Sequence, residues 1–382
     1  MPSGTPVFDW IIPREWTIRD AFLADHTGGR VIDFRRNNLH VVGYSTPVDR
    51  QLPLQEFQEH LFSLPDQPDA IPYVTSHYKE RWGFCLPDAQ RLRLKPGIYR
   101  AFIDSELKDG SLTYGECILP GATKQEIFLS TYVCHPSMAN NELSGPVVTA
   151  FVCNWIRSQP RRYTYRVVFI PETIGALTYL SRHLDHLRKN VVAGFNISCV
   201  GDERGFSCVG SRYADTLADR IAAHVLASMS PNYTAYSFLD RGSDERQCCS
   251  PGVDLPVVSL CRSKYGAYPE YHTSLDNLQL VTPNGLAGGY EMVRRCLEAL
   301  EQNRTFRVNS YGEPCLGKRG LYPTLSQKNS ASAVKTMMDF LAYSDGRNDL
   351  VRIADIIGVP VWDIFPIVSR LKEAGLISET DQ

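Results

Sequence analysis

The chain has 382 residues, a formal net charge of −2 and 21% charged residues. This length is enough for two or three domains and at least one large hydrophobic core. The nearly balanced charge gives no general attraction to nucleic acid or to an anionic membrane surface, and no apolar run approaches the roughly 20 residues of a transmembrane helix.

The N-terminal stretch and the cysteines bear on the cellular compartment. Residues 1–16 (MPSGTPVFDWIIPREW) lack the basic start and the apolar core of a secretory signal. The 11 cysteines contain no C-x-x-C pair, which is more typical of reduced thiols than of a disulfide framework. We therefore expect a cytoplasmic protein with no membrane partner.

The first 118 residues predict two segments. Within residues 1–45, positions 13–29 predict a capped helix that ends at Gly28-Gly29, and positions 29–44 predict two strands joined at Asn37-Asn38. Residues 46–118 are rich in proline and aromatic residues and have short alternating runs, with a hairpin signal at Asp109-Gly110. They predict a small, mostly β subdomain, whose aromatic stretch 73–84 is either a lid or part of the subdomain core.

Strands and helices alternate from about residue 120 to residue 300. Continuous apolar runs predict buried strands, and amphipathic stretches between them predict helices, which together indicate an α/β sheet covered by helices on both faces. The predicted strands are 127–133, 164–170, 191–200 and 255–261, and the predicted helices are 143–158, 176–190, 215–230 and 284–302.

The C-terminal part predicts a linker and a winged helix-turn-helix. Residues 304–328 are rich in glycine and proline, and residues 329–382 contain three amphipathic segments with Gly358-Val359 at the tight turn. Residues 329–382 carry five Lys or Arg against eight Asp or Glu. Because DNA affinity depends largely on neutralising phosphates, we expect no nucleic-acid partner. A role in packing or in forming a homo-oligomer fits this charge better.

Four polar residues follow predicted strands of the α/β region. His135, Glu172 and Asp202 come shortly after the first three strands, and His272 lies in the loop after the last one. Ligands bind open α/β sheets at the carboxyl ends of their strands. A metal hydrolase needs two or three ligands, an open position for water and a carboxylate that acts as general base. The four residues match these requirements.

Three motifs resemble the zinc aminopeptidase clan. The segment PGATKQEIFLSTYVCHP…NNELSG resembles the strand that ends in a ligand histidine and the loop before Ser-Gly. PETIG resembles the Glu-Glu-x-Gly motif whose first glutamate is the general base, and YHTSLDN resembles the closing ligand histidine with its following Thr and Asp. The whole chain resembles bacterial aminopeptidase-like proteins that have a β insertion and a C-terminal winged helix. The resemblance implies a catalytic domain of residues 1–45 and 119–303, with a mixed sheet, and an inserted subdomain of residues 46–118.

The sequence also departs from the clan at three carboxylate positions. Asn141, Thr173 and Ser198 stand where the clan has a metal-bridging Asp, a second Glu and a third-strand Asp. These losses argue against a two-metal site and leave a single zinc held by His135, His272 and one carboxylate. Glu142 and Asp202 compete for that carboxylate position, and Glu142 has the advantage of lying close to His135 in sequence.

The resemblance implies hydrolysis of an amide bond in a small peptide or an aminoacyl or acyl amide. Glu172 would take the proton of water, Asp276 would hold the His272 imidazole, and Asp244 and Arg246 would support the site or contact substrate. Two other hypotheses remain open. One is a deacylase in a biosynthetic pathway, and the other is a scaffold that has lost its metal and works through the winged helix.

Overall fold

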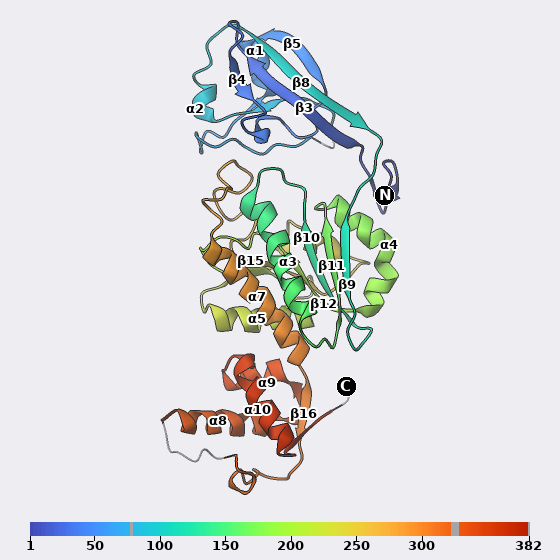
Figure 1. Cartoon of the computed structure of the whole chain (residues 1–382), viewed down its shortest axis with the longest axis vertical. Coiled ribbons are helices and arrows are strands. Elements are labelled where there is room, and N and C mark those ends of the chain that lie inside the picture. The colour runs from blue at the N-terminus through green and yellow to red at the C-terminus, as the bar shows by residue number, and fades with distance from the viewer. Residues whose placement is uncertain (77–78, 322–327, 381–382) are drawn as a thin grey trace.

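The computed structural model describes residues 1–76, 79–321 and 328–380. It consists of a β-rich domain, a central α/β domain and a winged helix, and the first and last of these lie at opposite ends of the central domain (Figure 1). The described part of the chain contains no helix that is both long enough and apolar enough to cross a membrane.

The central domain is built on a seven-stranded mixed sheet in the order β14-β13-β15-β12-β10-β11-β9. Strands β11, β10, β12 and β15 are mutually parallel, while β9 and β13 run antiparallel to their neighbours β11 and β15. The strands are β9 (Gly115–Leu119), β10 (Glu126–Tyr132), β11 (Thr164–Ile170), β12 (Val191–Ile197), β13 (Ser207–Val209), β14 (Thr234–Tyr236) and β15 (Val257–Cys261). Every residue of β10 is buried, as expected for a strand covered on both faces.

Helices cover both faces of this sheet. Helices α3 (Ser144–Arg157), α5 (Leu217–Met229) and α7 (Pro283–Gln302) pack on one face, and α4 (Ile174–Asn190) and α6 (Glu245–Cys248) pack on the other. Alternate residues of β10 point to opposite faces, so Ile127 and Leu129 contact the first layer and Phe128 contacts the second. The predicted fold class and the alternation of strands and helices are confirmed.

The β-rich domain contains a four-stranded antiparallel sheet in the order β4-β3-β8-β5. Its elements are β3 (Glu15–Ala24), β4 (Arg30–Asp33), β5 (Val48–Pro53), α1 (Leu54–Phe57), β6 (Leu61–Phe62), β7 (Phe84–Cys85), α2 (Asp88–Arg91) and β8 (Ile98–Lys108). A short pair, β1 (Pro6–Val7) and β2 (Trp10–Ile11), precedes them.

Several sequence predictions for this region are wrong. Residues 15–24 form a strand and not a helix, because β3 pairs along almost its whole length with β8. Residues 1–45 therefore supply strands of the β-rich domain and do not extend the catalytic sheet, so the expected boundary at residue 45 does not exist. Asp109-Gly110 does not close a hairpin, because β8 and β9 belong to different sheets. Strand β9 lies in the central sheet, although residues 115–118 were expected in the insertion.

The winged helix consists of a three-stranded sheet and three helices. The sheet has the order β17-β16-β18, and the elements are β16 (Thr305–Val308), α8 (Lys328–Tyr343), β17 (Asp345–Asp349), α9 (Leu350–Ile357), α10 (Val361–Glu373) and β18 (Ile377–Glu379). Gly358 lies in the left-handed region (φ 70°) and ends α9 at the predicted turn. The predicted linker 304–328 is wrong at its start, because β16 belongs to this sheet. Residues 322–327 of that linker, like 77 and 78 of the predicted lid stretch and the terminal 381 and 382, lie outside the described residues.

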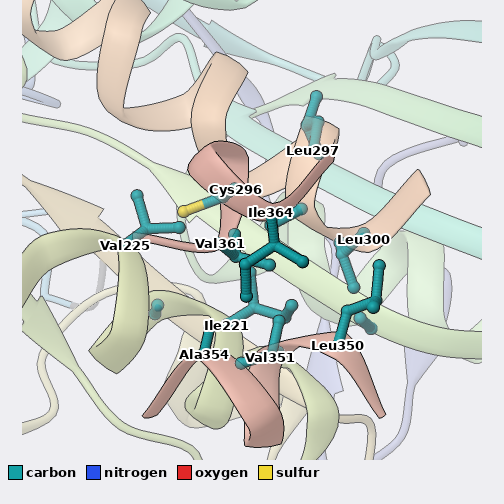
Figure 2. Packing of buried hydrophobic residues seen from close by; sticks show 14 of the residues in the cluster. Ile221, Val225, Cys296, Leu297, Leu300, Leu350, Val351, Ala354, Val361 and Ile364 are labelled. Atoms are coloured by element: carbon teal, nitrogen blue, oxygen red, sulfur yellow. The ribbon is translucent and has the colours of Figure 1, made fainter. Parts of the chain in front are cut away.

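The winged helix shares a hydrophobic core with the central domain. Figure 2 shows side chains from α5, α7, α9 and α10 that meet in one cluster, among them Ile221, Leu297, Val351 and Ile364. His224 of α5 joins the two parts through polar contacts: its Nε2 accepts a hydrogen bond from the Val361 N–H at 2.9 Å, and its Nδ1 lies 2.6 Å from Asp355 Oδ1. The packing therefore extends from the central sheet into the winged helix without a break.

Candidate metal centre and active site

The carboxyl ends of four adjacent parallel strands meet at one edge of the central sheet. His135 follows β10, Glu172 follows β11, Asp202 follows β12, and His272 lies in the loop after β15. The β-rich domain covers this edge through an isolated pairing of Pro72 with Thr273. The site therefore lies between the sheet edge and the β-rich domain.

His135 has close contacts with one carboxylate and one thiol. Its backbone N–H donates a hydrogen bond to Glu142 Oε2 at 2.8 Å, and its Nδ1 lies 3.3 Å from the same oxygen. The Cys134 Sγ lies 3.3 Å from His135 Nδ1 and accepts a hydrogen bond from the Glu172 N–H at 3.3 Å. Possible ligand atoms of Cys134, His135 and Glu142 all lie within 4.8 Å of one another.

Glu172 lies on the other side of the His135 ring. Its Oε2 is 3.7 Å from His135 Nε2, and its side chain is 19% exposed. Burial raises the pKa of the Glu172 carboxyl above its usual range, although the His135 imidazole and a hydrogen bond from Ser243 oppose that rise. A buried carboxyl with a raised pKa at a sheet edge has the properties required of a general base.

Asp244 and Arg246 lie beside Glu172. The Thr173 N–H donates a hydrogen bond to Asp244 Oδ1 at 2.7 Å, and Arg246 Nη2 donates to Thr173 Oγ1 at 2.5 Å. Burial and the neighbouring Glu172 raise the pKa of Asp244 well above its usual range. Asp244 Oδ2 and Arg246 Nε are both buried and have no hydrogen-bond partner within the described part of the chain.

His272 is held among aromatic rings. Its ring stacks on Tyr271 at 3.9 Å between centroids, and the rings of Tyr73 and His135 lie 5.1 Å away. Burial, with a smaller effect of His135, lowers the pKa of His272 to about 3. The imidazole is therefore neutral at neutral pH, and its buried Nε2 has no hydrogen-bond partner among residues 1–76, 79–321 and 328–380.

Asp276 contacts a different part of the site from the one expected. Its carboxylate accepts hydrogen bonds from the backbone N–H groups of Ala139, Asn140 and Asn141, at 3.1, 2.5 and 2.9 Å, and from the Tyr268 hydroxyl at 3.0 Å. These donors occupy the carboxylate, so the expectation that Asp276 holds the His272 ring is wrong. Asp276 instead fixes the start of a π-helical turn, Ala139–Leu143, that carries Glu142.

Asp202 also binds neighbouring loops. It is 1% exposed, and it accepts hydrogen bonds from the backbone and hydroxyl of Ser263, from the Arg204 N–H and from Asn140 Nδ2. It is not part of the close group formed by Cys134, His135 and Glu142. Of the two carboxylates that competed in the sequence, Glu142 is therefore the one that lies beside His135.

Two of the positions that depart from the clan lie in buried surroundings. Asn141 is 1% exposed, and its Nδ2 has no hydrogen-bond partner among the described residues. Ser198 is 2% exposed, and its hydroxyl lies 4.0 Å from Cys261 Sγ. Gly145 allows α3 to begin here, because a Cβ at this position would lie 2.5 Å from the Ile197 carbonyl oxygen. The Ser-Gly of the motif thus permits close packing of helix against sheet.

The backbone around the site is strained. Among the described residues, eight other than glycine have a positive φ, and four of them, Ser137, Thr173, Cys199 and His272, lie in the loops at this sheet edge. Such conformations cost about 1–3 kcal/mol each and cluster at functional sites. Two of the strained residues, Thr173 and His272, are a direct neighbour of Glu172 and a proposed site residue.

These residues fit a zinc ion. Imidazole, carboxylate and thiolate are the groups that zinc binds in proteins, and the described residues bring one histidine, one glutamate and one cysteine side chain into a single close group. The partnerless Nε2 of His272 is a further buried nitrogen at the same edge of the sheet. The chemistry of the donors therefore suits zinc better than a hard cation, which prefers oxygen alone.

Comparison with known proteins identifies the family. Residues 1–303 match the family described as a domain of unknown function, DUF4910, and residues 304–379 match a winged helix-turn-helix family. The chain belongs to the DUF4910 family. This match places the start of the winged helix at residue 304, which agrees with the pairing of β16.

Similar proteins connect this family with aminopeptidases. A protein of Clostridium acetobutylicum named as a candidate polysaccharide biosynthesis protein with an aminopeptidase-like domain is 44% identical over 92% of this chain and 81% of its own length. A crystal structure of a candidate peptidase from the same organism has a TM-score of 0.93 at 41% identity and covers 99% of this chain and 87% of its own. The resemblance to aminopeptidase-like proteins with a winged helix is confirmed.

Two more distant structures share much of this fold. A zinc aminopeptidase from Bacillus subtilis has a TM-score of 0.52 at 11% identity, covering 75% of this chain and 85% of its own. A peptidase M28 precursor from Shewanella amazonensis has a TM-score of 0.54 at 14% identity, covering 79% and 83%. At these identities the likeness extends to the fold, which is that of zinc aminopeptidases.

Sequence reasoning missed Cys134. It directly precedes the expected ligand His135, and β10 ends at Tyr132, so the alternation of side chains along a strand does not separate these two residues. Tyr73 begins the aromatic stretch 73–84 that the sequence offered as a lid or as subdomain core. Its ring lies 5.4 Å from that of His135, a contact that fits the lid alternative.

Proposed function

We propose that this protein is a zinc-dependent hydrolase that cleaves an amide bond with Glu172 as general base. The observation that supports this most directly is the position of Glu172, whose carboxyl is buried and lies 3.7 Å from His135 Nε2. Donors suited to zinc lie on the far side of the same imidazole. An aminopeptidase-like fold with a base and metal donors at one sheet edge is arranged for hydrolysis.

In this proposal His135, His272 and Glu142 hold one zinc, which would polarise the scissile carbonyl and lower the pKa of water when bound. Glu172 accepts the proton of the attacking water and then donates it to the leaving amine. Its raised pKa brings the carboxyl closer to the pH at which proton transfer is efficient in both directions. Ser243 orients the carboxyl through a hydrogen bond.

The surroundings favour a small substrate. Tyr73 comes from the β-rich domain and is anchored where its N–H donates a hydrogen bond to the His272 carbonyl oxygen at 2.8 Å. Its ring lies against both histidines. Because another domain closes over the sheet edge in this way, we propose a short peptide or an aminoacyl amide as substrate and not an extended polypeptide.

A second candidate is a deacylase that acts on an aminoacyl or acyl conjugate in a biosynthetic pathway. The name of the Clostridium acetobutylicum relative couples polysaccharide biosynthesis with an aminopeptidase-like domain, and that relative is 44% identical to this chain. The same base and metal donors would serve both reactions. A substrate panel of aminoacyl amides, short peptides and N-acylated sugars would separate the two candidates.

Metal content and one variant test the hydrolase proposal. We expect about one zinc per chain by elemental analysis. Glu172→Gln should retain this zinc and lower turnover by at least about two orders of magnitude, the scale of general acid–base catalysis. Loss of zinc from that variant would make Glu172 a ligand. A chain that binds no zinc and hydrolyses nothing would be a scaffold, and the hydrolase proposal would be wrong.

We also propose that the winged helix is a structural part of the enzyme and not a DNA reader. The first turn of α10 is capped by His224, and Val361 and Ile364 are buried in the core shared with α5 and α7. One face of α10 is therefore buried in the core, and the exposed side of its first turn carries the acidic Asp363, which does not favour a DNA groove. The acidic balance of residues 329–382 supports the same proposal.

Substitution of His224 tests how the winged helix is held against the central domain. His224→Ala leaves the Val361 N–H without its partner at a buried position, so we expect the free energy of unfolding to fall by about 1–3 kcal/mol. His26→Ala in the β-rich domain is a control that should change stability little. Salt-dependent, sub-micromolar binding of duplex DNA by the full chain would contradict the structural role.

A further inference from the structure

We infer that Cys134 is a zinc ligand, so that the metal is held by Cys134 Sγ, His135 Nδ1 and Glu142 Oε2 and not by histidines and a carboxylate alone. This inference rests on the proposed zinc site and changes its donor set. The resemblance to the clan assigns no role to the residue before the strand-end histidine.

Two of the three donor spacings match a tetrahedral zinc site, and the third, between Cys134 and Glu142, is at most 4.8 Å. With a Zn–N distance of about 2.0 Å, a Zn–O distance of about 2.1 Å and a Zn–S distance of about 2.3 Å, tetrahedral geometry places neighbouring ligand atoms roughly 3.3–3.6 Å apart. The observed distances are 3.3 Å from Cys134 Sγ to His135 Nδ1 and 3.3 Å from His135 Nδ1 to Glu142 Oε2. Among the described residues, no other group of three His, Cys, Asp or Glu side chains is this compact.

The surroundings hold both negative donors in place. The Glu172 N–H points to Cys134 Sγ at 3.3 Å, and the His135 N–H holds Glu142 Oε2 at 2.8 Å. Backbone N–H groups that donate to ligand atoms are the usual outer support of metal sites. Glu172 therefore supports the sulfur through its backbone N–H, while its carboxyl lies 3.7 Å from the other ring nitrogen of His135, Nε2.

The remaining coordination position suits water or substrate. Three protein ligands and one open position are the pattern of catalytic zinc, whereas structural zinc has four protein ligands. The three donors come from residues 134–135 and from the π-helical turn that carries Glu142, and Asp276 fixes that turn through three backbone N–H groups. His272 would then not be a ligand, and its Nε2, which has no hydrogen-bond partner among the described residues, would be available to a substrate.

Cobalt substitution tests the inference without relying on activity. The full-length protein loaded with Co(II) should show a near-ultraviolet thiolate-to-metal charge-transfer band. Cys134→Ser should abolish the band and weaken zinc binding by more than about 100-fold, which exceeds the usual effect of an outer-sphere residue. Cys315→Ser, at an exposed cysteine of the winged-helix region, is the matched control and should change neither.

A second variant guards against misfolding. Cys134→Asp offers a carboxylate in place of the thiolate, so it should recover much of the zinc affinity while still lacking the charge-transfer band. Metal binding with no thiolate band in the wild-type protein would overturn the inference and leave the proposed hydrolase intact. Failure of the wild-type protein to bind either metal would overturn both.

Discussion

Polar groups are buried at both ends of the strand pair β10 and β11, but the two ends differ in how far hydrogen bonds satisfy those groups. At the amino end, Arg166 donates hydrogen bonds to Glu126 at 2.7 and 3.1 Å, to Glu116 at 2.7 Å and to the Tyr179 hydroxyl at 3.0 Å. At the carboxyl end, four buried polar atoms have no partner among the described residues. They are Asn141 Nδ2, Asp244 Oδ2, Arg246 Nε and His272 Nε2.

This difference indicates that the polar groups at the amino end stabilise the fold and that those at the carboxyl end serve the candidate site. A buried charge stays in a fold at low cost only when its hydrogen bonds are satisfied, as they are around Arg166. Partnerless buried groups cost free energy, so a cluster of them marks a place where a ligand, an ion or a substrate completes the bonding. One sheet thus carries a structural ion network at one end and the candidate catalytic groups at the other.

The largest effect on stability should come from the ion network around Arg166, at the amino ends of β10 and β11. Arg166→Met removes the guanidinium that makes two hydrogen bonds to Glu126, whose side chain is 5% exposed, and leaves the buried carboxylate with His186 alone. We expect the free energy of unfolding to fall by about 3–5 kcal/mol in chemical denaturation. Arg19→Met, which breaks an exposed pair with Asp104, should change stability far less, because solvent screens that pair. Equal losses in the two variants would remove the distinction between the two ends.

A smaller effect should appear at the carboxyl ends of the strands, where His272 should make the free energy of unfolding depend on pH. His272 has an ordinary pKa of 6.5, which the folded chain lowers to about 3. Between these values the unfolded chain binds a proton that the folded chain does not, so the stability from this group is present above pH 6.5 and is lost as pH falls toward 3. The slope is at most about 1.4 kcal/mol per pH unit.

Comparison of the metal-free protein with His272→Gln would isolate that effect. Glutamine does not titrate, so the wild-type protein should lose stability relative to the variant as the pH falls below 6.5. Glu126 should contribute only at lower pH, because hydrogen bonds from Arg166 and His186 outweigh the effect of burial and hold its pKa below 4.5. Parallel stability curves for the two proteins between pH 7 and pH 5 would show that the His272 pKa is not lowered.

The smallest effect should be a gain in stability. Glu172→Gln removes a carboxyl that, together with burial, raises the pKa of the neighbouring Asp244. We expect the metal-free variant to be as stable as the wild-type protein or more stable by up to about 1 kcal/mol, while its turnover falls. Thermal denaturation in the presence of a chelator measures this. A marked loss of stability would make Glu172 a structural residue like Glu126.

The sequence by itself predicted the central domain well. The uninterrupted apolar runs of β10, β11 and β15 left no alternative to buried strands, since only a sheet covered on both faces hides such runs. The positions of His135 and Glu172 directly after those strands indicated that they lie at one edge. The helices of the winged helix were also visible, because Gly358 marks the turn between two amphipathic segments.

Tertiary contacts decided the rest. Residues 15–24 form a strand because β8, about 80 residues later in the chain, offers a complete pairing partner. Strand β16 was hidden in an apparent linker because β17 and β18 pair with it from far along the chain. Asp202 and Asp276 looked like site residues, yet each is occupied by backbone and side-chain donors that only the folded loops bring together. The sequence thus determined which strands exist and which residues follow them, because burial and periodicity are local properties. Contacts between distant segments decide which side chains complete each other's hydrogen bonds. They also decide which side chains are left free to bind a metal or a substrate.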